Sequence, residues 1–497
     1  MPSTPHSSYD PHHSSFVIPP SPVPPPSRDP LYALVTPIGA GAIATFLLDG
    51  DGALAKLEAI FRPRYQRVVA LNEPGQLLLG RIVDARGELV DEALAAPLAP
   101  KESATGCEQI ELSCHGGVGA SAAVCRALEE AGFRRELPGE LFARAHRAAR
   151  LGLPDLEARL RLPGVETARQ AEFLLSAAAL QEDWERFGLE VALGTRERRV
   201  DWRERVYQAA SMCLDRAPAA RRLLRTHRVV IAGPVNAGKS TLANRLLRAE
   251  ASIVSAEPGT TRDRLERQAS LRGLSVLLSD TAGLRDLAVD SGAVAGAHSQ
   301  PASHGPGEPQ DGGQEDEAVE RESQARALQA AQEADLVLIV VDGSRAPSES
   351  EVACVELLAK TAQASAAARP LRTEADVACL LVFNKVDRGL HAEAEGLAFT
   401  LGAQAFRISA QTGEGAEALE QGLESALLGG TAPTPGALFT RRQQRSIETL
   451  KAGLEEGLDG TALVGHIRNL LGTRPNEEEL AAVFREAEEE ERAQNAL

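Results

Sequence analysis

The spacing of apolar residues changes along the chain and separates stretches of different secondary structure. Short apolar runs predict strands at 31–35, 41–48, 76–80 and 109–113, and an amphipathic pattern at 120–131 predicts a helix. Residues 138–227 and 431–497 place apolar residues at helical spacing instead. Apolar runs of strand length return at 228–232, 275–278, 378–383 and 405–408. The pattern therefore predicts an α+β N-terminal domain at 30–137, helices at 138–227, a domain with buried strands at 228–430, and helices again at 431–497.

Two stretches lack the apolar residues that a folded core needs. Residues 1–29 are rich in Pro, Ser and His and have no apolar centre like that of a signal peptide. We expect a disordered leader there, or residues that precede the true start of translation. Residues 287–316 are rich in Gly, Pro, Ala, Ser and His, which predicts a disordered insertion. No apolar run is long enough to cross a membrane.

The clearest chemical signal follows the apolar run at 228–232. Residues 233–241 read Gly-Pro-Val-Asn-Ala-Gly-Lys-Ser-Thr, the spacing of a phosphate-binding loop between a strand and a helix. Gly233 and Gly238 let the backbone N–H groups turn toward phosphate oxygens. The Lys239 ammonium reaches the β- and γ-phosphates, and the Ser240 hydroxyl suits Mg²⁺. The alternative, an ordinary glycine turn, does not explain why a strand precedes the motif and a helix follows it.

Four further motifs follow in the order found in GTPases. They are Gly259-Thr260-Thr261, Asp280-Thr281-Ala282-Gly283, Asn384-Lys385-Val386-Asp387 and Ser409-Ala410. A threonine of the first and the aspartate of the second suit Mg²⁺. The Asp387 carboxylate can accept hydrogen bonds from guanine N1 and N2, which selects GTP over ATP. Each motif alone is weak evidence, but all five in this order predict a GTPase. The candidate GTP-binding residues are Gly233, Asn236, Ala237, Gly238, Lys239, Ser240, Thr241, Ser255, Thr260, Thr261, Asp280, Gly283, Asn384, Lys385, Asp387, Ser409 and Ala410.

Two features bear on how GTP is hydrolysed. Residue 284 is Leu, where a Ras-like enzyme has the glutamine that positions the attacking water, so that group must come from elsewhere. Asn236 lies inside the phosphate-binding loop, where its side-chain carbonyl could hold a monovalent cation in the place of an arginine finger. The alternative is that Asn236 only stabilises the loop. The accompanying segment 254–263 favours the cation.

The chain resembles the MnmE (TrmE) family of potassium-activated tRNA-modification GTPases over residues 31–485. The phosphate-binding loop, the segments 259–263 and 280–285, and Cys114-His115-Gly116-Gly117 carry the resemblance. It implies that the two helical segments form one α-helical domain, which is interrupted by an inserted α/β P-loop GTPase domain. It also implies a cytoplasmic homodimer that binds GTP and GDP, acts on tRNA and works with an FAD-containing flavoprotein.

The same resemblance implies the roles of individual residues. Ser240 and Thr261 would ligate Mg²⁺. The K⁺ ligands would be Asn236, Ser255, the Glu257 carbonyl and Thr260. Pro258 replaces the family's alanine in this loop and stiffens its backbone. Lys239 and Glu320 would be the catalytic residues, with Glu320 orienting the attacking water, although a solvated helix glutamate is the alternative for Glu320.

The resemblance is weaker at the positions that hold 5-formyltetrahydrofolate, the family's one-carbon donor. The candidate folate residues are Glu111 and Arg150, but the family's arginine falls on Leu47 and an aspartate on Gly152. The family's C-terminal Cys-x-Gly-Lys motif has no counterpart here. Two interpretations therefore remain. The chain is a tRNA-modification enzyme with a divergent folate pocket, or a paralogue that keeps the GTPase switch and binds RNA or the ribosome without one-carbon transfer.

Composition and charge add detail. The chain has 497 residues, enough for about three domains, and its net charge of −17 excludes a globally basic nucleic-acid coat. Residues 141–228 nevertheless carry 17 Arg and no Lys against 12 Asp and Glu, so this segment could meet tRNA phosphates or simply solvate its helices. The six cysteines include no Cys-x-x-Cys pair, which argues against a zinc site and fits a reducing compartment.

Overall fold

The computed structural model describes residues 28–36, 41–64, 76–148, 150–197, 201–249, 266–280, 325, 327–367, 378–472, 483–487, 489 and 492. The chain forms two compact units. The first runs to Leu156 and includes Gly472–Phe484, and the second holds Glu157–Leu471 and the residues from Arg485. Among the described residues, no helix is both long and apolar enough to cross a membrane.

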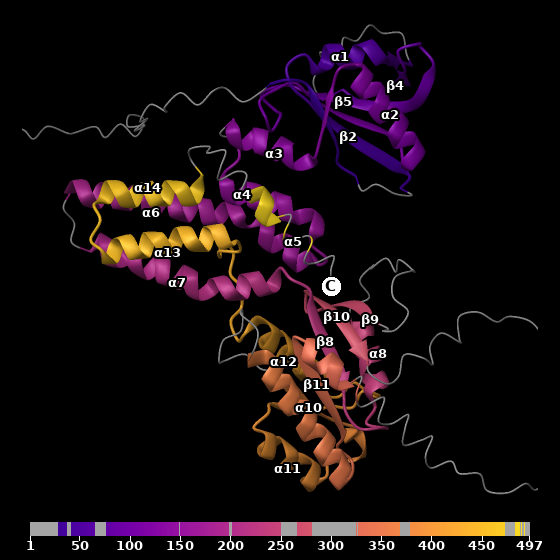
Figure 1. Ribbon diagram of the computed structural model, residues 1–497, viewed down its shortest axis with the longest axis vertical. Helices are drawn as coiled ribbons and strands as arrows, with labels where there is room; N and C mark the ends of the chain where they lie inside the picture. The colour runs from indigo at the N-terminus through magenta and orange to yellow at the C-terminus, as the bar shows by residue number, and fades with distance from the viewer. Residues whose placement is uncertain are drawn as a thin grey trace, which may run out of the picture. The chain divides into compact units, whose positions relative to one another are not determined.

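The first unit is built on a seven-stranded sheet with the order β3-β4-β5-β6-β2-β1-β7. Its strands are β1 (Leu31–Leu34), β2 (Ile43–Asp49), β3 (Phe61–Pro63), β4 (Leu78–Val83), β5 (Leu89–Leu98), β6 (Gln109–His115) and β7 (Arg134–Glu136). Helices α1 (Ala53–Ile60) and α2 (Val118–Glu130) cover one face of this sheet (Figure 1). Phe46, Ile110 and Leu128 are fully buried between the sheet and these helices.

Helix α3 (Pro138–Arg147) also belongs to the first unit. Leu141 packs against Leu31 and Ala33 of β1. The Arg144 guanidinium lies 3.0 Å from the Asp49 carboxylate, and both side chains are buried. The compact unit therefore continues past residue 137, where the sequence pattern places its end, because a buried ion pair and apolar contacts hold α3 to the sheet.

The second unit contains a six-stranded sheet with the order β13-β12-β11-β8-β10-β9. Its strands are β8 (His227–Ala232), β9 (Glu266–Leu271), β10 (Leu274–Asp280), β11 (Leu336–Asp342), β12 (Cys379–Asn384) and β13 (Ala405–Arg407). All except β9 are parallel to their neighbours. Their carboxyl ends therefore lie at one edge, where ligands bind in α/β sheets.

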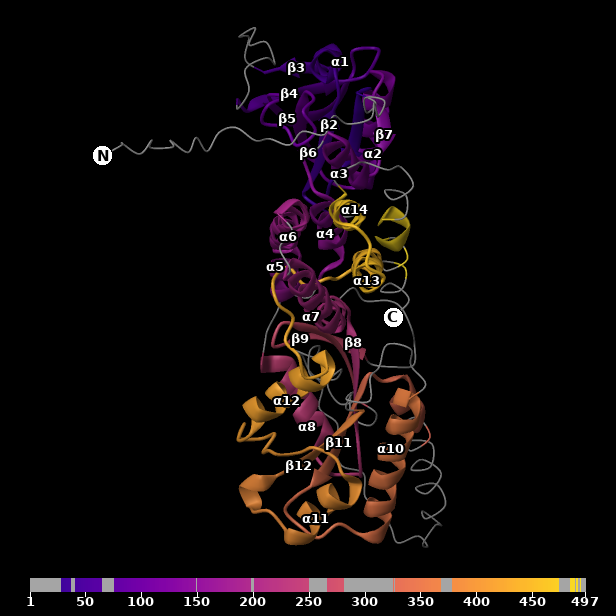
Figure 2. The same ribbon diagram turned by 90° about the vertical axis from the view of Figure 1, so that its left-hand side faces the viewer.

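Helices cover both faces of this sheet (Figure 2). Helices α8 (Lys239–Ala249) and α12 (Ala416–Leu428) pack on one face, and α10 (Glu349–Ala367) and α11 (Ala392–Leu401) pack on the other. The central strands β11 and β12 are apolar along almost their whole length, as expected where both faces of a strand are buried.

Four long helices of the second unit lie side by side around a separate apolar core (Figure 1). Helices α6 (Ala177–Glu197) and α7 (Trp202–Leu223) precede the six-stranded sheet in the sequence, and α13 (Arg441–Glu455) and α14 (Gly460–Leu471) follow it. Trp184 and Trp202 from the first pair are buried in the same cluster as Leu450 and Ile467 from the second. Helices from both sides of the sheet domain thus share one core, which we call the helical bundle.

A buried carboxylate joins the two chain segments that flank the sheet domain. Glu157 of α4 (Leu153–Arg161) accepts hydrogen bonds from Arg442 at 2.6 and 2.9 Å, from the Gln443 amide at 2.7 Å and from the Thr440 hydroxyl at 3.1 Å. Burial alone would raise the pKa of Glu157, but the charge and hydrogen bonds of Arg442 outweigh burial and hold that pKa below its ordinary value. Glu157 is therefore ionised at neutral pH.

Replacing this carboxylate should destabilise the bundle strongly. Glu157→Ala removes the countercharge of the largely buried Arg442 guanidinium, which then keeps the carbonyls of Asn469 and Leu470 as acceptors, and this costs about 3–5 kcal/mol in the free energy of unfolding. Both tryptophans of the chain, Trp184 and Trp202, lie in the bundle core, so chemical denaturation followed by tryptophan fluorescence measures this unfolding.

Glu448→Ala is the matched control, because Glu448 is exposed on the same helix as Arg442 and should change stability by less than about 0.5 kcal/mol. The difference in the free energy of unfolding between wild type and Glu157→Ala should be largest at neutral pH, where Glu157 is ionised. It should shrink as the pH falls through the depressed pKa of Glu157, since the carboxylate is then protonated in the folded state. Equal losses from the two substitutions would contradict this role of Glu157.

Candidate nucleotide-binding site

The phosphate-binding loop leaves β8 and enters α8 with a backbone that only glycine permits at two points. Gly233 has φ 143° and Gly238 has φ 89°. A Cβ at Gly233 would lie 2.1 Å from the Val340 carbonyl oxygen, and a Cβ at Gly238 would lie 2.2 Å from the Asn384 amide nitrogen. Both neighbours occupy the space of a side chain, so the two glycines are required by the close approach as well as by φ.

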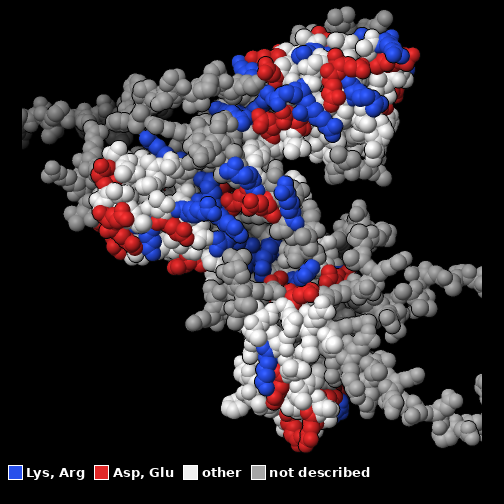
Figure 3. Space-filling model, viewed as in Figure 1, with Lys and Arg blue, Asp and Glu red and all other residues white. Residues whose placement is uncertain are grey.

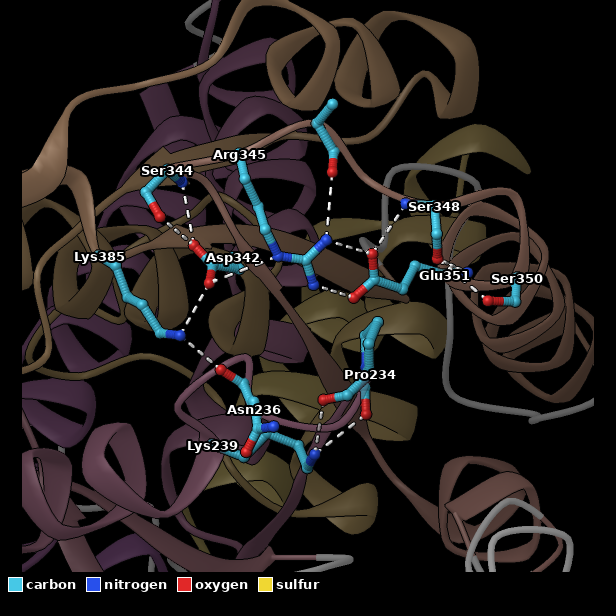
Figure 4. A network of polar contacts seen from close by, with 12 residues as sticks. Pro234, Asn236, Lys239, Asp342, Ser344, Arg345, Ser348, Ser350, Glu351 and Lys385 are labelled. Atoms are coloured by element: carbon cyan, nitrogen blue, oxygen red, sulfur yellow. Dashed lines mark hydrogen bonds and ion pairs between the residues drawn. The ribbon is translucent and has the colours of Figure 1, made fainter. Parts of the chain in front are cut away.

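The Lys239 side chain is folded into this loop, and its ammonium is buried (Figure 4). The Nζ donates to the carbonyl oxygens of Gly233 at 3.1 Å and Pro234 at 2.9 Å. An ammonium placed at the start of a helix can bind phosphate oxygens as a compact positive charge. Ser240 and Thr241 begin the same helix, next to this charge.

The Asn384 side chain connects three of the motifs predicted from the sequence. It is 2 % exposed, at the end of β12. Its amide nitrogen donates to the Ala237 carbonyl at 2.9 Å, and its amide oxygen accepts from the Ala410 N–H at 2.9 Å. One buried side chain therefore fixes the phosphate-binding loop and the loop after β13 relative to β12.

Lys385 and Asp342 form a second link at the same edge (Figure 4). Lys385 has φ 66°, and its Nζ donates to the Asn236 carbonyl at 2.6 Å and lies 2.8 Å from the Asp342 carboxylate. Burial by itself would raise the pKa of Asp342, but hydrogen bonds from Lys385 and Ser344 outweigh burial and keep that pKa below its ordinary value. The sequence reasoning missed Asp342, although an aspartate that ends an apolar strand at this edge was the available signal.

The residues expected to read guanine lie in the segments that follow β12 and β13. Asp387 is exposed in the short turn after Lys385. The Ser409 hydroxyl accepts from the Thr412 N–H at 3.1 Å and shapes the following loop. Arg245 of α8 donates to the Ala410 carbonyl at 2.6 Å and so fixes this loop to α8. No local sequence motif predicts this contact.

The other candidate site residues are described only by their position in the chain or not at all. Asp280 ends β10 at the same edge as the phosphate-binding loop, since β10 runs parallel to β8. The remaining candidates lie outside the described residues, and these are Ser255, Glu257, Thr260, Thr261, Gly283 and Glu320.

The candidate folate residues lie in the first unit. Glu111 is exposed on β6, directly opposite Leu47 of β2 in the strand register. Leu47 stands where the family has an arginine, so Glu111 has no cation at that position. The Leu47 side chain packs with the apolar residues of β1 and α3 instead. The Arg150 guanidinium donates to the carbonyls of Pro100 at 3.1 Å and Ser103 at 2.8 Å. Arg150 thus already holds a loop of its own unit.

The arginine-rich segment 141–228 has structural partners for several of its cations. Arg144 pairs with Asp49, Arg169 with Glu424 at 2.6 Å and Arg225 with Asp335 at 3.1 Å. Figure 3 shows Lys and Arg side chains gathered with acidic ones over the bundle near the start of α13. These arginines therefore have partners within the protein, and their presence does not by itself indicate nucleic-acid binding.

Known proteins resemble this chain along most of its length. Residues 228–385 match a family model described as 50S ribosome-binding GTPase, and residues 30–150 match one described as GTP-binding protein TrmE N-terminus. The tRNA modification GTPase MnmE of Symbiobacterium thermophilum is 31% identical over 463 residues, which cover 87% of this chain and 91% of that protein. The protein of the same name from Roseiflexus sp. is 31% identical over 501 residues, which cover 92% and 98%. That from Halorhodospira halophila is 32% identical and covers 94% and 91%.

Removing the Asp342 charge should weaken nucleotide binding. Asp342→Asn takes away the anion that holds Lys385 against the phosphate-binding loop, so the site is less preorganised. We expect the affinities for GDP and GTP to fall together by about tenfold, ~1.4 kcal/mol, in titrations with a fluorescent guanine nucleotide.

Glu351→Gln is the matched control for this experiment. Glu351 belongs to the same polar network and pairs with Arg345, but it does not contact Lys385 (Figure 4). This variant should keep its affinity within about twofold of wild type, a change of only ~0.4 kcal/mol. An unchanged affinity in Asp342→Asn would remove Asp342 from the site.

Proposed function

This chain belongs to the MnmE family of tRNA modification GTPases, and from this premise we propose that its hydrolysis of GTP uses Mg²⁺ and K⁺ bound beside the phosphates. The observation that carries the proposal is the conformation of Asn236. Its left-handed backbone, φ 63°, turns its carbonyl to Lys385 and leaves its side chain exposed at the phosphate-binding loop. A side-chain carbonyl in that place suits a monovalent cation.

Two positions with oxygen-bearing residues lie where Mg²⁺ would bind. Ser240 opens α8, and Asp280 ends the neighbouring parallel strand, so the two positions lie at one edge of the sheet. Hydroxyl and carboxylate oxygens are the ligands that Mg²⁺ prefers, and Thr261 would complete the set. When bound, the ion neutralises charge on the β- and γ-phosphates.

The K⁺ ligands would be Asn236, Ser255, the Glu257 carbonyl and Thr260. Lys239 would stabilise negative charge on the transferred phosphate, and Glu320 would orient the attacking water. Pairing of two GTPase domains in a homodimer would order the segment 255–261 around the cation.

The substrate and partner proposals follow from the family. The chain would act on tRNA in the cytoplasm together with an FAD-containing flavoprotein. The second candidate is a paralogue that keeps the GTPase switch and binds RNA or the ribosome. Two contacts favour it. Leu47 places an apolar side chain opposite Glu111, and Arg150 is engaged with backbone carbonyls.

GTP hydrolysis should be faster in KCl than in NaCl at equal ionic strength. Because K⁺ takes the role of an arginine finger, we expect a difference of at least about tenfold in kcat. Phosphate release by the full-length protein measures it.

Asn236→Ala provides the internal control for this comparison. It should remove the advantage of KCl and keep GDP affinity within a few-fold of wild type. Equal rates of the wild type in the two salts would contradict the cation mechanism.

Calorimetry with 5-formyltetrahydrofolate tests whether one-carbon chemistry is retained. A tRNA-modification enzyme should give saturable heat, and Glu111→Gln should weaken the binding because Glu111 lies at the candidate folate position. A wild type that gives no saturable heat but hydrolyses GTP would instead support the paralogue.

A further inference from the structure

We propose that Arg169 of helix α5 and Glu424 of the GTPase domain are positioning residues for GTP hydrolysis. They fix the tip of the β9–β10 hairpin, whose opposite end adjoins the nucleotide site. The inference rests on the proposed function, because it assigns residues to the same hydrolysis. We call the contacts at the hairpin tip the hairpin clamp, which consists of Thr167, Arg169, Arg272, Gly273 and Glu424.

The clamp begins with the amino terminus of helix α5 (Ala168–Leu175). The Thr167 hydroxyl accepts from the Gln170 N–H in a capping box and donates to the Gly273 carbonyl at 2.7 Å. The Arg169 guanidinium donates to the Arg272 carbonyl at 2.8 Å. Both acceptors are backbone atoms of the hairpin turn, so the clamp holds the turn itself rather than a flexible side chain.

Glu424 connects the clamp to the body of the GTPase domain. It lies on α12, and its carboxylate is 2.6 Å from both the Arg169 and the Arg272 guanidinium. Burial by itself would raise the pKa of Glu424, but hydrogen bonds from Arg272 and Arg169 outweigh it and lower that pKa. One carboxylate thus joins a cation of α5 to a cation of the hairpin tip.

The turn has little freedom to move within the clamp. Arg272 has φ 50° and Gly273 has φ 77°, the left-handed conformations of a tight two-residue hairpin turn. A Cβ at Gly273 would lie 2.7 Å from the Arg169 side chain. The close approach of Arg169 therefore requires glycine at this position for steric as well as conformational reasons.

The hairpin leads from the clamp to the hydrolysis site. β9 starts at Glu266, directly after the segment that contains Thr260 and Thr261, and β10 ends at Asp280, where the next predicted motif begins. The two strands pair without interruption from Glu266–Ser279 to Leu271–Leu274. A two-stranded ribbon fixed at its tip sets the starting point of both segments relative to the phosphate-binding loop.

A hydrolysis rate that depends on sub-ångström placement should respond to release of the clamp. Glu424→Gln and Arg169→Gln should each lower kcat by about tenfold and leave the affinity for GDP unchanged, because neither residue touches the nucleotide-binding residues described above. Glu424→Asp keeps the charge and should recover part of the lost kcat.

The same variants allow a second measurement, which would not change if the clamp only stabilised the fold. Trp184 and Trp202 are the only tryptophans of the chain, and both lie in the bundle. Their fluorescence in the full-length wild type should differ between GDP and a non-hydrolysable GTP analogue, because the clamp links the hairpin to α5, and α5 leads directly into α6 of the bundle. Glu424→Gln should reduce this difference, because the contacts of Thr167 and Arg169 with the turn carbonyls remain.

Glu395→Gln is the matched control, since Glu395 also pairs with an arginine, Arg407, on the surface of the same domain but far along the chain from the hairpin. It should keep wild-type kcat and the wild-type fluorescence difference. A wild type that neither binds nor hydrolyses GTP would refute the proposed function. A wild type that hydrolyses GTP, with Glu424→Gln equal to it in kcat and fluorescence, would refute the clamp and leave the function standing.

Discussion

The nucleotide site depends on one buried amide. Asn384 donates to the phosphate-binding loop and accepts from the loop after β13, so three segments distant in sequence acquire fixed relative positions. A side chain that is both donor and acceptor can do this only when both partners are present, because an unpaired buried amide is costly. Gly238 is part of the same constraint, since a side chain there would occupy the space of the Asn384 amide. Around this fixed centre, Lys385 and Asp342 align the polar residues at the carboxyl edge of the sheet.

The nucleotide motifs were predictable from the sequence because each is local and follows its own strand. The two-sided burial of the parallel strands makes them continuous apolar runs, and this pattern identified β8, β10, β12 and β13. The strands β9 and β11 of the same sheet were not predicted, although β11 is a continuous apolar run, and β5 of the first unit was missed as well. Its alanine-rich residues 89–98 have weak strand propensity, and their conformation comes from pairing with β4 and β6 on either side. Contacts such as Arg169 with Glu424 join residues 255 positions apart, and no local pattern encodes such a pair.

The two compact units differ in how well they keep the family's chemistry. The GTPase domain retains the glycines and the lysine of the phosphate-binding loop, and Asn384 joins that loop to the loop after β13. In the first unit, two arginines make structural contacts instead: Arg144 pairs with buried Asp49, and Arg150 donates to backbone carbonyls of a loop. A guanidinium that already satisfies buried or backbone acceptors is less available to a ligand. The charge of a segment is therefore a poor guide to its partners until the internal pairs have been identified.

The shared core of the helical bundle has a consequence for how the protein is made. Helices α6 and α7 leave the ribosome first, but α13 and α14, which cover Trp184 and Trp202, follow only after residues 224–440. At ~5–20 residues per second, synthesis of that stretch takes roughly 10–40 s. During this time the six-stranded sheet domain can fold, since its elements are contiguous, while the apolar faces of α6 and α7 have no native cover. The nascent chain must therefore keep these apolar faces soluble until α13 and α14 appear, so the bundle is completed after the sheet domain.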